Sequence, residues 1–303
     1  MSLVALPELL ADALSAGYAL GYFESWDLPS LKAVVNAAQE LSSPVVIGFN
    51  GGILTDSKRI LKPENLEYYG AVGRIAAEKT SVPMALMLNE IGTIELAQAA
   101  IDFGFNALMF EAESDDFEED VARTKEVVEM AHAAGLSVES AAGHLPTADQ
   151  HGFQRGSASG TLTSPEQARH FADQTGVDIL GVSIGNVEVL TDGKATMDFE
   201  LLERIHKATD VPITLHGGSG IADEHVGELV ARGLSKMNLG AALNQAFLAG
   251  MDKAMKSTSQ HASPKYRIGS GLDVDVLAAG EIAMTELVKH KMGVYGSIGK
   301  ANS

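Results

Sequence analysis

The chain has 303 residues, and 46% of them are hydrophobic, which is enough for a large core and excludes a globally disordered chain. Its net charge of −18 disfavours nucleic acid as a partner, because phosphate backbones repel an acidic surface. The absence of cysteine excludes disulfides and thiol catalysis, and the absence of a leader pattern or of about 18 successive apolar residues predicts a cytoplasmic protein without membrane contact.

Eight short apolar segments recur along the chain, separated by polar or amphipathic stretches. We predict strands at residues 18–23, 45–49, 84–88, 107–110, 136–141, 179–184, 213–216 and 235–239. Residues 117–134 show helical periodicity, with valines on one face and charges opposite, and Gly135 follows as a terminator. Strands that alternate with helices predict parallel βαβ units, and eight such units predict an α/β fold of the (β/α)8 TIM barrel type.

The chain contains no clear linker and no low-complexity segment, so we predict that residues 1–303 form a single TIM-barrel domain. A long polar segment at about 144–164 follows the fifth strand. It would form either a lid over the barrel or an ordinary surface loop. The last residues, from about 275 to 303, are predicted to form a C-terminal helical extension.

Polar residues follow almost every predicted strand. In chain order they are Glu24, Asn50, Asn89 and Glu90, Glu111 and Glu113, Glu139 and His144, Gly185 with Asn186 and Glu188, His216, and Asn238. The catalytic groups of TIM barrels lie at the C-terminal ends of the strands. We therefore expect these side chains to meet at one mouth of the barrel.

The most specific stretch is TLHGGSGIADEHVGELVARG at residues 214–233. It combines a strand that ends in His216, a turn containing Gly217, Gly218 and Ser219, and the start of a helix. Glycines allow close approach of the backbone, and helix N-termini attract anions, so this turn is a candidate phosphate site. The alternative is an ordinary strand-to-helix turn.

His216, Glu90 and Glu188 form a candidate metal set, because one imidazole and two carboxylates suit a divalent ion. Each has a plainer interpretation, as a buried core histidine or a solvated loop carboxylate. The three residues come from three strands, so no sequence spacing certifies the set.

The order of these motifs resembles the class II, metal-dependent fructose- and tagatose-bisphosphate aldolases over nearly the whole chain. The stretches that carry the resemblance are residues 97–140, 163–186, 197–221 and 290–301. The resemblance implies a TIM barrel, a divalent metal such as zinc, and a sugar or sugar-phosphate substrate. It also implies a homodimer or homotetramer with the C-terminal helices at the contacts.

The site departs from the family pattern where the chemistry is expected. The third strand of the family ends in Leu-His-Leu-Asp-His-Gly, in which the Asp exchanges a proton and the His after it binds zinc. Asn89 and Glu90 occupy these positions here, and Glu188 aligns with a second zinc histidine. The third zinc histidine is kept as His216.

These changes alter the expected chemistry. Two carboxylates make the metal a weaker Lewis acid, and they admit Mn²⁺, Fe²⁺ or Mg²⁺ as readily as Zn²⁺. Because Asn89 cannot exchange a proton, we expect Glu139 to carry it, with Glu24 or Glu111 as alternatives.

Fewer cations are expected around the substrate than in the family. A family Lys aligns with Asp192, and a family Arg aligns with Asn244. The substrate would therefore carry one phosphate or none. A phosphate would be held by Gly217, Gly218, Ser219 and Asn238, and Asn50 and Gly185 are further candidate substrate contacts.

Three functions remain open at this point. The leading hypothesis is an aldolase-like carbon–carbon lyase that acts on a sugar phosphate or related hydroxy-ketone through a metal-stabilised enediolate, with Glu139, Asn89 and Asn238 at the catalytic centre. A metal-dependent ketose isomerase or epimerase would use the same intermediate without cleaving a bond. A sugar-phosphate binding protein without turnover is the third.

Overall fold

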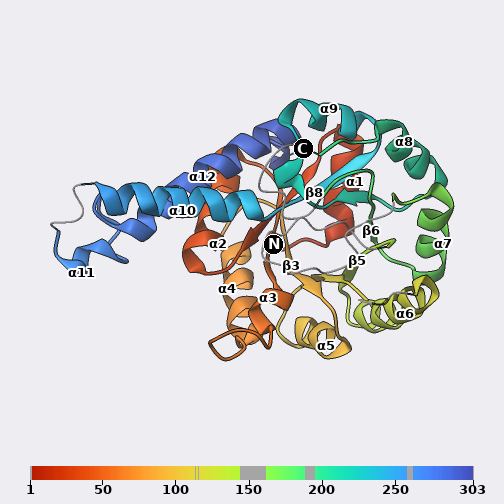
Figure 1. Cartoon of the computed structure of the whole chain (residues 1–303), viewed down its shortest axis with the longest axis horizontal. Coiled ribbons are helices and arrows are strands. Elements are labelled where there is room, and N and C mark those ends of the chain that lie inside the picture. The colour runs from red at the N-terminus through yellow and green to blue at the C-terminus, as the bar shows by residue number, and fades with distance from the viewer. Residues whose placement is uncertain are drawn as a thin grey trace.

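The computed structural model describes residues 2–112, 114, 116–143, 162–187, 195–257 and 262–302. Eight parallel strands follow one another around a closed barrel, and the last pairs with the first (Figure 1). Helices alternate with the strands and cover the outside of the barrel. The predicted (β/α)8 TIM barrel is confirmed.

All eight predicted strands are present. They are β1 (Leu20–Ser25), β2 (Val45–Asn50), β3 (Met84–Ile91), β4 (Ala107–Phe110), β5 (Ser137–Ala141), β6 (Ile179–Gly181), β7 (Ile213–Leu215) and β8 (Leu234–Leu239). The sixth is shorter than predicted because the chain leaves the sheet after Gly181. Beyond that point Thr163 satisfies the backbone of Ser183. The Thr163 N–H donates to the Ser183 carbonyl at 2.8 Å, and the Thr163 hydroxyl accepts from the Ser183 N–H at 2.9 Å.

The third strand is longer than predicted, because it continues through Asn89 and Glu90 to Ile91. Its pairing with β4 shifts register between Leu88 and Ile91. Such an irregularity re-aims the side chains that it contains. The two polar residues thus lie within an irregular strand end rather than in a loop.

The helices begin at α1 and end with a C-terminal pair. They are α1 (Leu6–Ala16), α2 (Leu28–Leu41), α3 (Gly51–Thr55), α4 (Leu66–Glu78), α5 (Ile94–Asp102), α6 (Phe117–Ala133), α7 (Pro165–Thr175), α8 (Phe199–Ala208), α9 (Asp223–Ala231), α10 (Ala241–Lys256), α11 (Pro264–Arg267) and α12 (Val276–Tyr295). The helix predicted at 117–134 is α6. Asp116 caps it by accepting from the Glu118 and Glu119 N–H groups, and Val127 and Ala131 are buried on its inner face.

Helix α1 closes the N-terminal end of the barrel. Its buried residues Leu6, Leu9 and Leu10 share one apolar cluster with residues inside the barrel, such as Val46 and Ala107. Apolar burial of this kind contributes about 1.5–3 kcal/mol for each fully buried leucine. With this end filled, chemistry is confined to the opposite end, where the strands terminate.

Helices α10 and α12 pack side by side and project beyond the barrel as an arm with α11 at its tip (Figure 1). The predicted C-terminal extension is therefore helical, and it ends in a 3-10 turn at Lys300–Asn302. Among the helices of the described ranges, none combines the length and apolarity needed to cross a bilayer.

Candidate active site

Four side chains from β5, the end of β7 and β8 form one buried network, which consists of Glu139, His216, Lys236 and Asn238. His216 Nε2 lies 2.8 Å from Glu139 Oε1, and Lys236 Nζ lies 2.7 Å from Glu139 Oε2. Glu139 and Lys236 are 0% exposed, and His216 is 2% exposed. Burial at this level is exceptional for Lys and Glu unless they are paired, as they are here.

Asn238 joins the same network through both ends of its amide. Its Oδ1 accepts a hydrogen bond from Lys236 Nζ, and its Nδ2 lies 2.8 Å from His216 Nε2 and 3.4 Å from Glu139 Oε1. Asn238 thus points into the barrel among charged groups. The buried network accounts for two residues predicted as catalytic, Glu139 and Asn238, and for His216.

Electrostatics keep Glu139 ionised. Burial alone would raise the pKa of the Glu139 carboxyl, but Lys236 and His216 outweigh it and lower the pKa to about 2. Burial lowers the pKa of Lys236, and the facing Glu139 opposes this shift. Glu139 therefore carries no proton at neutral pH and is available as a hydrogen-bond acceptor.

Lys236 was not among the residues predicted for the site. A signal was present, because Lys236 and Asn238 are two residues apart in one strand and so point to the same face. A lysine on the inner face of a barrel strand needs a buried counter-ion, and Glu139 is that partner.

Tyr22 of β1 lies beside Lys236 of the network. Its ring centroid is 5.2 Å from Lys236 Nζ, and its side chain is 1% exposed. Burial and the carboxylates of Glu24, Glu90 and Glu139 raise its pKa well above the usual value, so the phenol stays neutral. Its hydroxyl has no hydrogen-bond partner among the described residues.

A second group of polar residues lies on the other side of the mouth, at the ends of β1, β2 and β3. We call it the amide–carboxylate cluster, and it consists of Glu24, Asn50, Asn89 and Glu90. Asn50 Nδ2 donates to Glu90 Oε2 at 2.5 Å and to Glu24 Oε2 at 3.3 Å. Asn89 Nδ2 donates to Glu90 Oε1 at 2.9 Å. Both Glu90 oxygens thus accept hydrogen bonds from amides.

Glu90 has an unusual backbone. Its φ is +52°, in the left-handed region that residues other than glycine seldom occupy, and this conformation costs about 1–2 kcal/mol. It lies in the irregular end of β3. The surrounding structure, including the amides of Asn50 and Asn89, stabilises this conformation against that cost.

The glycine turn after β7 lies beside the start of α10. Gly217 has a φ of +71°, and a Cβ on Gly218 would approach the Asn238 carbonyl oxygen to 2.7 Å. Ser219 Oγ accepts a hydrogen bond from the Ala242 N–H at 3.0 Å. The turn and the first residues of α10 are therefore held together, as the candidate phosphate site requires.

Gly185, the other glycine predicted to contact substrate, follows β6. Its φ is +106°, and its backbone packs closely against the Thr196 carbonyl. This close packing leaves no room for a Cβ, so the fold itself requires glycine at this position whether or not it also contacts substrate.

The residues present suit a divalent cation in chemical type, since imidazole and carboxylate oxygens are accepted ligands. His216 and Glu90 both lie at the C-terminal ends of their strands, on the side of the barrel mouth. Predicted residues that lie outside the described ranges are Glu113, His144, Glu188 and Asp192. Within those ranges, no three His, Asp or Glu side chains are arranged to hold a metal.

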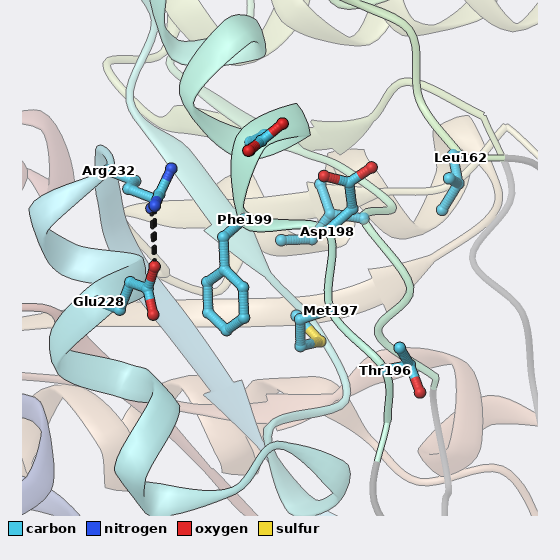
Figure 2. A pocket seen from close by; sticks show the side chains of 9 residues that line it. Leu162, Thr196, Met197, Asp198, Phe199, Glu228 and Arg232 are labelled. Atoms are coloured by element: carbon cyan, nitrogen blue, oxygen red, sulfur yellow. Dashed lines mark hydrogen bonds and ion pairs between the residues drawn. The ribbon is translucent and has the colours of Figure 1, made fainter.

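A separate cleft of about 560 Å³ lies between the start of α8, the end of β6 and helix α9. Figure 2 shows Met197 and Phe199 on one side of it and the Arg232–Glu228 ion pair on the other. Among the described residues, none of those predicted for the site lines this cleft.

Comparisons with known proteins agree over the full length of the chain. The family described as "Fructose-bisphosphate aldolase class-II" matches residues 4–300. The fructose-bisphosphate aldolase of Geobacillus stearothermophilus is 31% identical over 301 residues, 99% of each chain. The sulfofructosephosphate aldolase of Alkalicoccus urumqiensis is 28% identical over 309 residues, 100% of each chain. The crystal structure of the YdjI aldolase from Escherichia coli K12 covers 99% of each chain at 28% identity, with a TM-score of 0.79.

Proposed function

Because this chain belongs to the class II fructose-bisphosphate aldolase family, we propose that it is a carbon–carbon lyase acting on a sugar phosphate or a related hydroxy-ketone. The observation that carries the proposal is the gathering of His216, Glu139, Asn238 and Glu90 at one barrel mouth beside the glycine turn after β7. Members of this family act on sugar phosphates and are generally metal-dependent.

A divalent ion, when bound, would stabilise the negative charge of the enediolate that bond cleavage leaves on the ketone fragment. His216, Glu90 and Glu188 are the proposed ligands. Zinc is the expected ion by family, while the carboxylates also suit Mn²⁺, Fe²⁺ or Mg²⁺. The hydrogen bonds from Asn50 and Asn89 would fix the direction of the Glu90 carboxylate.

Cleavage of a hydroxy-ketone needs a base for the departing hydroxyl proton and an acid that reprotonates the carbon. Glu139 is ionised but has a pKa of about 2, and both its oxygens face His216 and Lys236. We therefore propose that Glu139 acts by orienting His216 through their hydrogen bond rather than by exchanging a proton with the substrate. Glu24 on β1 and Glu111 after β4 are partly exposed, and we propose that one of them exchanges the proton with the substrate.

We propose that a phosphate, where the substrate has one, binds at the turn of Gly217, Gly218 and Ser219. The backbone dipoles of such a turn and of the nearby start of α10 favour an anion. The relatives compared above bear the names of different sugar-phosphate aldolases. The family name therefore leaves open which sugar phosphate this chain would cleave.

The test is a screen of product formation. Purified protein is incubated with mono-phosphorylated and unphosphorylated ketoses, and the products are identified by mass spectrometry. Release of an aldehyde and a smaller ketone supports a lyase. Stereoisomers of the same mass would indicate an epimerase or isomerase instead. Saturable ligand binding without any product would indicate a binding protein and overturn the proposal.

The metal ligands are tested separately, by elemental analysis of protein purified without chelator. About one equivalent of a divalent metal is expected, with loss of that metal in Glu188→Ala. Glu166→Ala, an exposed change at the start of α7, is the matched control and should keep the metal. Retention of stoichiometric metal by Glu188→Ala would overturn the assignment of this ligand.

We also propose that the arm of α10, α11 and α12 contacts a second copy of the chain, in a homodimer or homotetramer. It carries exposed apolar side chains, including Leu248 at 64%, Ile268 at 65% and Ile282 at 64%. Patches of this kind mark interaction surfaces. Light scattering should report a smaller mass for Ile282→Asp than for the wild type, and an unchanged mass would remove this helix face from the interface.

A further inference from the structure

The carboxylate of Glu24 lies against the residue that precedes α10. Strands β1 and β8 pair in parallel with Phe23 opposite Leu239, so the next residues, Glu24 and Gly240, lie side by side. A Cβ placed on Gly240 would lie 3.5 Å from Glu24 Oε1 and 3.7 Å from Glu24 Oε2. Outside the adjoining residues of the chain, the three atoms closest to that point all belong to this carboxyl group. Glu24 therefore places its charge at the N-terminus of α10.

Helix α10 receives its N-terminal partners from other parts of the chain. Gly240, the N-cap residue, has no side chain to cap the helix, and among the described residues of the first turn none is acidic. The Ala242 N–H donates to Ser219 Oγ at 3.0 Å. Helix N-termini favour negative charge. Glu24 and Ser219 thus supply what an acidic first turn and an N-cap side chain supply at other helices.

Asn50 holds the Glu24 carboxylate in place. Asn50 Nδ2 donates to Glu24 Oε2 at 3.3 Å, and Asn50 Oδ1 is itself fixed because it accepts from the Ile53 N–H at 2.9 Å. The other oxygen, Glu24 Oε1, is the one that lies closer to Gly240. The charge beside α10 is therefore a built part of the barrel mouth.

We infer that Glu24 is a specificity-determining residue, whose carboxylate supplies the negative charge at the start of α10, so that this part of the mouth accepts the hydroxyl groups of a ketose and disfavours a phosphate. The substrate class rests on the proposed function, and it narrows that proposal to substrates without a phosphate at the turn of Gly217, Gly218 and Ser219. Acceptance of a hydrogen bond from a substrate hydroxyl is compatible with the proton exchange proposed for Glu24.

A phosphate at this turn would meet like charge. A phosphate monoester carries about −1.5 to −2 charges at pH 7, and the Glu24 carboxylate would lie beside it across Gly240. Like charges placed side by side disfavour binding, whereas a hydroxyl group donates to carboxylate oxygens. Lys236 does not offset the repulsion, because it is 0% exposed and already paired with Glu139.

The experiment is a calorimetric titration of the purified protein with inorganic phosphate at about pH 8, where the phosphate is mainly a dianion. The wild type is compared with Glu24→Gln, which keeps the length of the side chain and removes its charge. We expect Glu24→Gln to bind inorganic phosphate about 10–100-fold more tightly than the wild type.

The position of the added phosphate is tested in the double variant Glu24→Gln with Gly218→Ala. A Cβ on Gly218 would approach the Asn238 carbonyl oxygen to 2.7 Å, so the alanine displaces the turn. The double variant should therefore lose the gain in phosphate affinity. A gain that survives Gly218→Ala would mean that the phosphate binds elsewhere, and it would overturn the inference.

The matched control is Glu111→Gln. Glu111 is also partly exposed, but it follows β4, which is a neighbour of neither β1 nor β8. This variant should bind inorganic phosphate as the wild type does. Equal phosphate affinity in the wild type and Glu24→Gln, or an equal gain in Glu111→Gln, would overturn the inference. Where Glu24→Gln does not fold, the wild type decides, because wild-type phosphate affinity that is lost in Gly218→Ala would contradict a mouth that disfavours phosphate.

The titration also separates this inference from the proposed function, since it needs no turnover. Protein without lyase activity in which Glu24→Gln gains phosphate affinity would contradict the lyase proposal alone. Protein with lyase activity in which Glu24→Gln gains no phosphate affinity would contradict the specificity role of Glu24 alone.

Discussion

The two sides of the barrel mouth hold their carboxylates in different ways. On the side of β5, β7 and β8, Glu139 is fully buried and paired with a lysine and a histidine. On the side of β1, β2 and β3, Glu90 and Glu24 are partly exposed and share the amide of Asn50. The first side relies on opposite charges in the core, and the second relies on neutral amides and a strained backbone.

This difference means that the two sides of the mouth should tolerate substitution to different degrees. A buried ion pair tolerates little change, because removal of one partner leaves an isolated charge in the core. A half-exposed carboxylate held by amides tolerates replacement at small cost, since water can take over the lost contacts. Asn89 and Glu90, two of the positions at which the sequence predicts a departure from the family pattern, lie on the tolerant side.

The largest effect should come from Glu139→Gln. The substitution keeps the shape of the side chain but leaves Lys236 as a buried charge without its counter-ion. We expect a loss of about 3–5 kcal/mol in the free energy of unfolding, measured with urea at neutral pH. Glu24→Gln, on the other side of the mouth, is the control and should cost less than about 1 kcal/mol. Equal losses of unfolding free energy in Glu139→Gln and Glu24→Gln would show that the two sides of the mouth do not differ in their tolerance to substitution.

The stability that Glu139 contributes should depend on pH. The pKa of Glu139 is lowered from 4.5 to about 2, so its charged form is favoured in the folded protein. The contribution is complete above about pH 4.5 and is lost as the pH falls toward 2, and linkage gives it a size of roughly 3 kcal/mol.

The measurement is the difference in unfolding free energy between the wild type and Glu139→Gln across this acidic range. The difference should be constant from neutral pH to about 5 and should narrow below that. A difference that stays constant down to about pH 3 would mean that Glu139 is not selectively stabilised in its charged form.

A smaller effect is expected from Asn50→Ala. Asn50 caps α3, since its Oδ1 accepts from the Ile53 N–H, and its Nδ2 also holds Glu24 and Glu90. Loss of the cap costs about 1 kcal/mol, and the contacts to carboxylates raise the expected total to about 2–3 kcal/mol.

Asn65→Ala is the matched control for this variant. Asn65 caps α4 in the same manner, by accepting from the Glu67 N–H. It should lose only about 1 kcal/mol, by thermal or urea unfolding. If the two asparagine variants lose the same amount, the amide of Asn50 does not stabilise the amide–carboxylate cluster.

Much of the fold was predictable from sequence because it depends on local patterns. Apolar segments separated by helical periodicity placed all eight strands, and His216 and Glu90 were expected at the mouth because barrel strands end there. The end of β3 was less predictable. The register shift after Leu88 is set by pairing with β4, which a single strand sequence does not encode.

The buried network could be predicted only in part. Glu139, His216 and Asn238 were each predicted at the end of a strand. The ion pair of Glu139 with Lys236 was not, because it joins residues 97 positions apart in two strands that are not neighbours. Its existence follows from closure of the barrel, which turns inward-facing positions of all strands toward one another. The left-handed backbone of Glu90 likewise carries no signal in the sequence, because glycine is the usual residue there.

The smallest effect tests that backbone. Glu90→Gly and Glu90→Ala both remove the contacts from Asn50 and Asn89, but only glycine relieves the cost of a φ of +52°. The glycine variant should therefore be more stable than the alanine variant by about 1 kcal/mol, in urea unfolding under identical conditions. The comparison cancels the lost hydrogen bonds and isolates the strain. An alanine variant as stable as the glycine variant would show that the end of β3 relaxes once the carboxylate is gone, so that the amides, rather than the sheet, hold this backbone in place.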